Sequence, residues 1–373
     1  MKIVIIQGAF LPVPPVLGGA VEKMWYKLGK IFASHNHQVT HVCKSYDSML
    51  QSEKQDGVTY VRIKGYNTPK SIILLKILDL FYSIRAVRKI PPDTEIVISN
   101  TFWVPILLRR QKNIRIYVDI QRQPKGQIRF YSHVFKLRTN STAVSKSVQE
   151  ELTIQMHSKI LMIPNPIPFV NLDNFTVPEK KNIILYVGRV HPEKGLELLI
   201  EAYRQTEQSY LLYIIGPHEI SNGGGGGAYL QKLQSLAKGQ NIKFLGAIFD
   251  EATLINYYSE AAIFVYPSVA EKGETFGIAP LEAMSWGCVP IVSNLDCFQD
   301  FINSENGLIF DHRNINASQL LAIHLRELQN NTSLRNKLAN EAIKVRQTHS
   351  SQNIAELFLK DFCQPKDERV QAK

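Results

Sequence analysis

The feature that most constrains the fold is an alternation of short β-branched runs with segments of helical periodicity. In the first half the runs are 3–7, 38–43, 58–63, 95–99 and 114–120. Between the first two runs, apolar residues recur at spacings of three and four, the spacing of one helix face: Val21, Met24, Trp25, Leu28, Ile31 and Phe32. Strands that alternate with helices form parallel sheets covered on both faces. The sequence therefore predicts a doubly wound α/β domain.

A second round of the same pattern follows the Pro- and Asn-rich segment 164–182, which we expect to be a linker. Its apolar runs are 183–188, 210–216, 242–247, 262–268, 289–294 and 307–310. A chain of 373 residues suits two domains of roughly 150–200 residues. We expect Rossmann-like αβα domains at 1–168 and 169–351, with the closing helix 352–373 joining the first domain. Two such domains facing each other predict a deep cleft for a ligand.

Charge is distributed unevenly along the chain, whose net charge is +10. Residues 1–170 carry 24 Lys and Arg against 10 Asp and Glu, whereas residues 171–373 carry 19 against 23. The first half thus favours an anionic partner: nucleic acid, an anionic membrane surface or a lipid-phosphate acceptor. A well-solvated basic surface explains the same excess.

Other compositional signals indicate a cytoplasmic protein. The opening MKIVIIQGAF predicts a buried strand rather than a signal peptide. The longest apolar stretch, 72–90, is interrupted by charged residues, so no membrane span is expected. The four cysteines show no metal-ligand spacing and suit a reducing compartment.

Glycine-rich segments carry little specific signal. The run NGGGGG at 222–227 lacks a following Lys-Ser/Thr pair, so a mobile surface loop is a better interpretation than a phosphate loop. No GxGxxG with a later acidic residue follows the first strand, which argues against a nicotinamide enzyme.

The stretch GETFGIAPLEA, 273–283, places Glu274 before an expected helix start and Glu282 about one turn inside it. The backbone amides of Phe276, Gly277 and Ile278 at that helix start are suited to an anion. Carboxylates accept hydrogen bonds from hydroxyl groups, so the pair would hold two parts of one elongated ligand with an anion between them. Two solvated glutamates near a helix start are the alternative.

Two further helix starts carry candidate anion-binding residues. In YVGRVHPEKG, Arg189 and Lys194 follow a strand end. The arginine guanidinium can donate two hydrogen bonds to one phosphate and the lysine adds a positive charge, which suits a diphosphate. Ordinary surface charge is the alternative for that pair. In LGGAVEK, Gly18 and Gly19 precede the first helix and would let a phosphate come close.

Taken in order, these motifs resemble the retaining glycosyltransferases of family 4, which have the GT-B fold. The resemblance covers nearly the whole chain and is strongest from about 183 to 310. It implies a nucleotide-sugar donor held mainly by the second domain, with no cofactor. No DxD motif occurs in the chain, in line with a metal-independent family.

The resemblance also implies a role for each matching residue. Glu274 would bind the hydroxyls of the transferred sugar and Glu282 the ribose. Arg189 and Lys194 would neutralise the diphosphate. Backbone would hold the rest: Phe276, Gly277 and Ile278 the distal phosphate and sugar, Gly246 to Ile248 the base, and Gly19 the phosphate from the first domain.

The first domain departs from the family pattern. Asp119 stands about where relatives often carry a histidine, and Asn100 occupies another such place. We expect Asp119 to contact the sugar hydroxyl or the acceptor instead.

The predicted function is transfer of a hexose with retention, most simply from UDP-glucose or a related UDP-sugar. The acceptor would be a glycan or lipid-linked acceptor in polysaccharide, lipopolysaccharide or exopolysaccharide biosynthesis. The alternatives are a GDP-mannose-dependent mannosyltransferase, a non-catalytic nucleotide-sugar-binding subunit and a nucleotide-sugar 2-epimerase. A nucleic-acid partner does not fit this reading.

Cations lie on or beside the expected 71–89 helix: Lys70, Lys76, Arg85, Arg88 and Lys89. This pattern is typical of membrane-surface helices, although an ordinary buried helix explains its apolar part. We expect peripheral association with the inner face of the plasma membrane.

Overall fold

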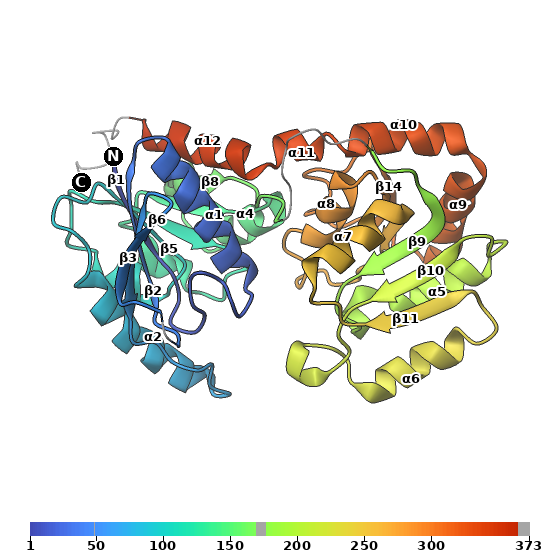
Figure 1. Cartoon of the computed structure of the whole chain (residues 1–373), viewed down its shortest axis with the longest axis horizontal. Helices are drawn as coiled ribbons and strands as arrows, with labels where there is room; N and C mark the ends of the chain where they lie inside the picture. The colour runs from blue at the N-terminus through green and yellow to red at the C-terminus, as the bar shows by residue number, and fades with distance from the viewer. Residues whose placement is uncertain (48, 169–176, 365–373) are drawn as a thin grey trace. The chain divides into compact units, whose positions relative to one another are not determined.

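The computed structural model describes residues 1–47, 49–168 and 177–364, and the chain divides into two compact units (Figure 1). Unit 1 comprises Met1–Pro168 and Ser351–Lys373, and unit 2 comprises Phe169–Ser350. Part of the predicted linker, 169–176, and the end of the predicted closing helix, 365–373, lie outside the described residues.

Unit 1 is built on an eight-stranded sheet of order β3-β4-β2-β1-β5-β6-β7-β8. All neighbours pair in parallel except β3 with β4. The strands are β1 (Lys2–Ile6), β2 (Gln38–Lys44), β3 (Ser52–Gln55), β4 (Val58–Ile63), β5 (Ile96–Ser99), β6 (Arg115–Ile120), β7 (Lys136–Thr139) and β8 (Ile160–Met162). Buried residues alternate between two apolar clusters along β1, Ile3 and Ile5 in one and Val4 and Ile6 in the other, because successive side chains of a strand point to opposite faces.

Helices cover both faces of this sheet. They are α1 (Ala20–Ser34), α2 (Ile72–Val87), α3 (Trp103–Leu107), α4 (Thr142–Gln149) and α12 (Ser351–Phe362), with two 3-10 helices at Ile128–Tyr131 and Ile154–Lys159. The helix α12 returns from unit 2 and lies beside α1 (Figure 1). Its Phe358 ring lies 5.2 Å from Trp25, and its Asp361 accepts a 2.6 Å hydrogen bond from Tyr117 on β6.

Unit 2 has a six-stranded sheet of order β11-β10-β9-β12-β13-β14, parallel throughout. Its strands are β9 (Lys181–Val187), β10 (Leu211–Ile215), β11 (Ile242–Gly246), β12 (Ala261–Tyr266), β13 (Val289–Ser293) and β14 (Leu308–Phe310). Its helices are α5 (Leu196–Arg204), α6 (Gly227–Leu236), α7 (Glu251–Glu260), α8 (Ile278–Ser285), α9 (Ala317–Asn330), α10 (Thr332–Ala342) and α11 (Val345–Thr348), with short 3-10 turns at Pro192–Lys194 and Ile220–Asn222.

The predicted α/β class is therefore observed in both units, and the differences are local. The antiparallel strand β3, SEKQ, has no apolar alternation and was not predicted. The same holds for β7, which is only four residues long.

The glycine run is the clearest correction to the sequence prediction. Gly224 and Gly226 are buried, and backbone amides of the run donate to the carbonyls of Val190 and His218 at 2.8 and 2.7 Å. A Cβ on Gly224 would lie 2.2 Å from a backbone carbon of His218. The run is thus a tightly packed turn before α6, because only glycine permits this close backbone approach.

Substitution of Phe358 tests the assignment of α12 to unit 1. Phe358→Ala removes a fully buried ring, so the free energy of unfolding should fall by about 3–5 kcal/mol. Leu357→Ala, one residue away and 39% exposed, should cost less than about 1 kcal/mol. Urea denaturation measures both, and equal losses would contradict the assignment.

Candidate functional site

Backbone hydrogen bonds of glycines connect the carboxyl ends of β9, β10 and β11. Gly188 follows β9 and donates to the carbonyl of Ile215, and Gly216 follows β10 and donates to that of Gly246 at 2.8 Å. A Cβ on Gly216 would lie 1.8 Å from the carbonyl oxygen of Gly188. Parallel sheets place ligands at this edge, and the close approach brings the predicted Gly246 segment beside the loop that carries Arg189.

Lys194 and Glu274 form a buried ion pair in unit 2. The Lys194 Nζ lies 2.7 Å from Glu274 Oε2, and the two side chains are 6% and 11% exposed. The Nζ also lies 5.4 Å from the centroid of the Tyr266 ring, at the end of β12. The structure therefore brings together two predicted site residues that are 80 positions apart in the sequence.

This pairing depends on how the start of α5 meets the end of β12. Gly195 has φ +67°, and a Cβ there would lie 2.0 Å from the carbonyl oxygen of Pro267. The carbonyl of Glu193 accepts hydrogen bonds from the Val269 amide and the Ser268 hydroxyl. These backbone contacts join the two loops, so that Lys194 faces the segment that carries Glu274.

Arg189 is more exposed and is held by two partners. Its Nη2 lies 2.5 Å from Glu193 Oε1, and its Nη1 donates to the carbonyl of Gly223 at 2.8 Å. Glu193 also lies 3.9 Å from Lys194. A single carboxylate thus stands between the two predicted diphosphate-binding cations. Glu193 was not among the predicted site residues, although its place between Arg189 and Lys194 in the motif HPEKG is a usable signal.

The helix α8 begins at the predicted place. Its N-cap residue, Gly277, has φ +87° and provides no side-chain cap. The first backbone N–H groups of the helix therefore receive no hydrogen bond from a capping side chain. A Cβ on Gly277 would lie 2.5 Å from a carbon of the Phe298 ring. Glycine is therefore required here by protein packing as well as by the left-handed backbone.

Glu282 lies inside α8 and is buried. Its Oε2 accepts a 2.9 Å hydrogen bond from the hydroxyl of Tyr258, a buried residue of α7. Burial, and then the charge of Glu282, raise the pKa of Tyr258 well above its ordinary value. Tyr258 was missed because nothing in its sequence context distinguishes it from a core tyrosine.

An aromatic cluster supports the loop before α8. The ring of Phe276 lies 5.7 Å from Phe301 and 6.4 Å from His349, which follows α11. Arg346 on α11 donates to the carbonyl of Ser285 at the end of α8. The last segment of unit 2 therefore holds both ends of the helix that carries Glu282.

The predicted base-binding segment lies at the end of β11. Gly246 has φ +70° and open space on the side where a Cβ would lie. Ile248 is half-buried. The residues predicted in unit 2 thus lie at or after the carboxyl ends of β9, β11 and β12, with Ile278 and Glu282 in α8.

The residues predicted in unit 1 have different surroundings. Gly19 is the N-cap of α1 with φ +95°, preceded by Gly18 with φ +80°. A Cβ on Gly19 would lie 2.2 Å from Glu22 Oε2, so this carboxylate lies against the helix start. Burial, with a contribution from Asp119, raises the pKa of Glu22.

Asp119 is a structural residue, contrary to expectation. Its side chain is fully buried, with Oδ1 2.7 Å from Arg138 Nη1. Trp25 donates to Oδ2 at 2.7 Å, and Gln121 donates to both oxygens. Because its acceptor sites face these partners, the structure does not support contact of Asp119 with a sugar or an acceptor. The sequence reading missed Arg138, which lies on a strand that was not predicted.

The described residues contain no group of three or more His, Cys, Asp or Glu side chains that could hold a metal ion. Over the same part of the chain, no helix has the length and apolar character needed to cross a membrane.

Replacing Arg138 tests the structural role of Asp119. Arg138→Met leaves a buried carboxylate without its cation, so the free energy of unfolding should fall by about 3–5 kcal/mol. Lys136→Met, on the same strand but half-buried, should cost less than about 1 kcal/mol. Adding Asp119→Leu to Arg138→Met should restore much of the loss in urea denaturation. Equal effects of Arg138→Met and Lys136→Met would reopen a ligand role for Asp119.

His349 predicts acid sensitivity of unit 2. Burial lowers its pKa from 6.5 to about 4, so between these values the unfolded chain binds a proton that the folded chain does not. Stability is therefore lost as the pH falls through this window, by about 2 kcal/mol at pH 5. His349→Phe should reduce the drop in Tm between about pH 7.5 and about pH 5, whereas His324→Phe on α9 should not. A drop of unchanged size in His349→Phe would refute this assignment.

Comparison with known proteins agrees with this geometry. Residues 171–345 match the family model described as glycosyl transferases group 1. The O-antigen chain mannosyltransferase RfbU of Salmonella typhimurium is 30% identical over 178 residues, which cover 46% of this chain and 45% of that protein. The chain spans less than half the length of most curated relatives it matches.

Solved structures match over nearly the whole chain. Sucrose-phosphate synthase from Thermosynechococcus elongatus is 20% identical, with a TM-score of 0.75 and coverage of 97% of this chain and 98% of that one. HepE of Anabaena, solved in complex with UDP and glucose, is 15% identical, with a TM-score of 0.68 and coverage of 97% and 99%. These likenesses confirm the predicted GT-B fold. Over residues 171–345 the chain is therefore similar to the group 1 glycosyltransferases.

Proposed function

We propose that the chain transfers a hexose, with retention of configuration, from a nucleotide diphosphate sugar to a glycan or lipid-linked acceptor. The observation that carries this proposal is the buried pair of Lys194 and Glu274 in the same unit as the open N-terminus of α8. A cation, a carboxylate and free helix amides are the groups that a sugar diphosphate requires.

Each group has a distinct task in the proposed donor complex. Glu274 accepts hydrogen bonds from hydroxyls of the sugar, and Glu282 from those of the ribose. Lys194 and Arg189 neutralise the diphosphate. The backbone supplies the remaining contacts: Phe276, Gly277 and Ile278 to the distal phosphate and sugar, Gly246 to Ile248 to the base, and Gly18 and Gly19 to the phosphate from unit 1.

In the reaction, the bond from the anomeric carbon to the phosphate oxygen breaks while a bond to the acceptor oxygen forms on the same face. The proton of the acceptor hydroxyl passes to the departing phosphate oxygen. The two cations and the amides of α8 stabilise the leaving group electrostatically, so the proposed reaction is independent of metal and cofactor. Glu274 orients the sugar and does not act as a proton-transferring base.

Two observations bear on the donor. HepE was solved with UDP and glucose, which supports a UDP-sugar such as UDP-glucose. Curated relatives such as RfbU are named mannosyltransferases, which favours a GDP-mannose donor as the second candidate. The O-antigen in the name of that relative supports a role in polysaccharide biosynthesis.

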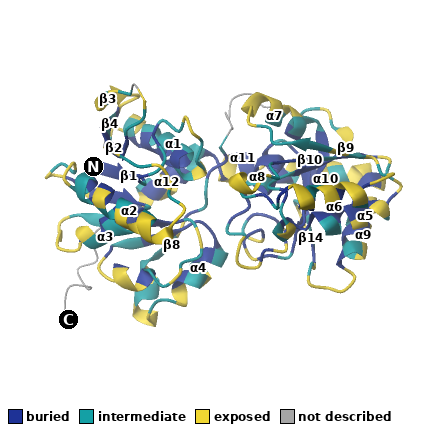
Figure 2. Cartoon of the chain, turned by 90° about the horizontal axis from the view of Figure 1, so that it is seen from below, coloured by how far each residue is buried: buried dark blue, intermediate teal, exposed yellow. Residues whose placement is uncertain are grey.

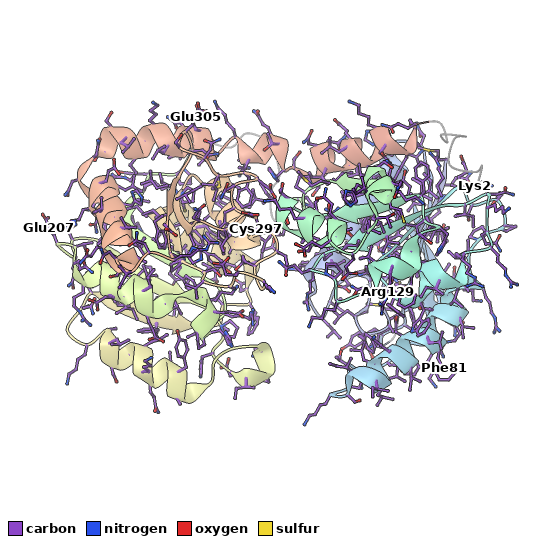
Figure 3. The ribbon with its side chains drawn as sticks, turned by 180° about the vertical axis from the view of Figure 1, so that it is seen from behind. Lys2, Phe81, Arg129, Glu207, Cys297 and Glu305 are labelled. Atoms are coloured by element: carbon purple, nitrogen blue, oxygen red, sulfur yellow. The ribbon has the colours of Figure 1, made fainter. Side chains whose placement is uncertain are left out.

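A thermal-shift panel with UDP, GDP, ADP and their sugars tests the donor site. UDP and UDP-glucose should raise the Tm, and Glu282→Gln should weaken nucleotide binding about tenfold because the ribose loses a charged acceptor. Glu274→Ala should remove the added effect of the sugar while UDP still binds. Glu305→Ala, an exposed carboxylate of the same unit (Figure 3), is the matched control.

Two outcomes of this panel would contradict the proposal. Unchanged nucleotide binding in Glu282→Gln would disprove the ribose assignment. Stabilisation by UDP without slow release of free sugar from UDP-glucose would indicate a non-catalytic binding subunit.

A further inference from the structure

The helix α2 is largely apolar, and part of its apolar surface is open to solvent. Tyr82 and Ala86 lie in the core of unit 1. The opposite side carries a stripe of exposed apolar residues, and Ile73, Ile77 and Phe81 recur in it every four positions. We call the following residues the α2 stripe: Ile72, Ile73, Leu74, Ile77 and Phe81, with exposed fractions of 73, 74, 45, 45 and 55%. Figure 2 shows exposed residues along α2. A contiguous exposed apolar surface marks an interaction site, so the stripe calls for a partner.

Unit 1 holds α2 in this orientation. The backbone amides of Phe102 and Trp103 donate to the buried carboxyl of Asp79, whose pKa burial raises to about 6. The Trp103 indole donates to the carbonyl of Lys76 at 2.8 Å. At the other end, Ser71 caps the first turn by accepting from the Leu74 amide. These contacts prevent the helix from turning the stripe toward the core.

The surroundings of the stripe are cationic. Between residues 64 and 89 the sequence has six Lys or Arg and one acidic residue, the buried Asp79. The exposed cations of this segment are Lys64, Lys70, Lys76, Arg88 and Lys89.

A second aromatic group adjoins α2. Lys76 Nζ lies 5.2 Å from the centroid of the Phe102 ring, and that ring lies 6.2 Å from Phe130. Phe130 is 51% exposed, and the Arg129 guanidinium lies 5.3 Å from its ring centroid. Figure 3 labels Phe81 on α2 and Arg129 in the same unit. The contacts from Lys76 through Phe102 thus extend the surface from α2 to Phe130, again with an arginine at its edge.

We propose that the α2 stripe is the surface by which unit 1 docks on an anionic phospholipid bilayer, with its apolar side chains among the acyl chains and the flanking cations at the phosphates. Apolar residues flanked by Lys and Arg are the chemistry of interfacial helices. A two-fold contact with a second copy of this chain would place the same cations against each other. The charge therefore favours the bilayer over self-association.

This inference rests on the proposed function for its purpose, since a docked unit 1 would meet a lipid-linked acceptor at the membrane. The binding itself requires no donor. A failure to bind vesicles and a failure to bind nucleotide can therefore be told apart in separate measurements.

Vesicle flotation of the full chain tests the proposal. The wild-type chain should float with vesicles of phosphatidylcholine and phosphatidylglycerol, less so with phosphatidylcholine alone, and should be released at about 0.5 M salt. Ile73→Ser combined with Ile77→Ser should weaken binding about tenfold or more. Lys76→Glu with Arg88→Glu should abolish the preference for the anionic lipid.

Matched substitutions in unit 2 control for a general effect of surface polarity. Ile315→Ser with Ile323→Ser changes two isoleucines that are 98 and 50% exposed, and this variant should float like the wild type. All variants should keep the wild-type circular-dichroism spectrum and the wild-type Tm without ligand, which shows that both units are folded.

Three results would overturn the proposal. One is the absence of flotation with anionic vesicles. Another is equal loss of binding in the unit 2 control. The third is a dimer in light scattering that Ile73→Ser with Ile77→Ser dissociates, which would assign the stripe to a second copy.

Discussion

The arrangement of the candidate donor site depends on the buried ion pair between Lys194 and Glu274. An unpaired charge at this depth would be strongly unfavourable, and the backbone contacts between the loops after β9 and β12 hold the two charged groups together. Gly195, pressed against Pro267, allows the approach. The start of α8 follows Glu274 in the same segment. The ion pair therefore joins groups from distant parts of the sequence beside this helix start.

Contacts between charged residues that lie far apart in the sequence explain what motifs could and could not predict. Lys194 and Glu274 were predicted from motifs, yet their direct contact was not, because a motif specifies residue types and not their partners. Asp119 shows the opposite error. It occupies a plausible position at a strand end, but Arg138 and Trp25 take up its oxygens, and only the three-dimensional neighbourhood reveals a structural ion pair.

Periodicity predicted most helices and strands because burial on two faces leaves a strong apolar pattern. Periodicity did not predict segments that are held by backbone hydrogen bonds rather than by packed side chains. The glycine run before α6 is an example: its composition suggests mobility, whereas hydrogen bonds to Val190 and His218 hold it in place. Periodicity also could not decide whether the outer side of α2 is buried. A largely apolar helix can have the same sequence whether it lies within a core or at a surface.

The sequence by itself determined the α/β class and the two rounds of the fold, and it supplied the residue types of the candidate donor site. These features follow from local patterns: alternation, helix starts and the chemistry of carboxylates and cations. Only the tertiary structure decided that Asp119 is buried, that Glu193 lies between Arg189 and Lys194, and that the α2 stripe faces solvent. Each of these depends on contacts between residues far apart in the chain, and the free energy of such contacts leaves no local pattern in the sequence.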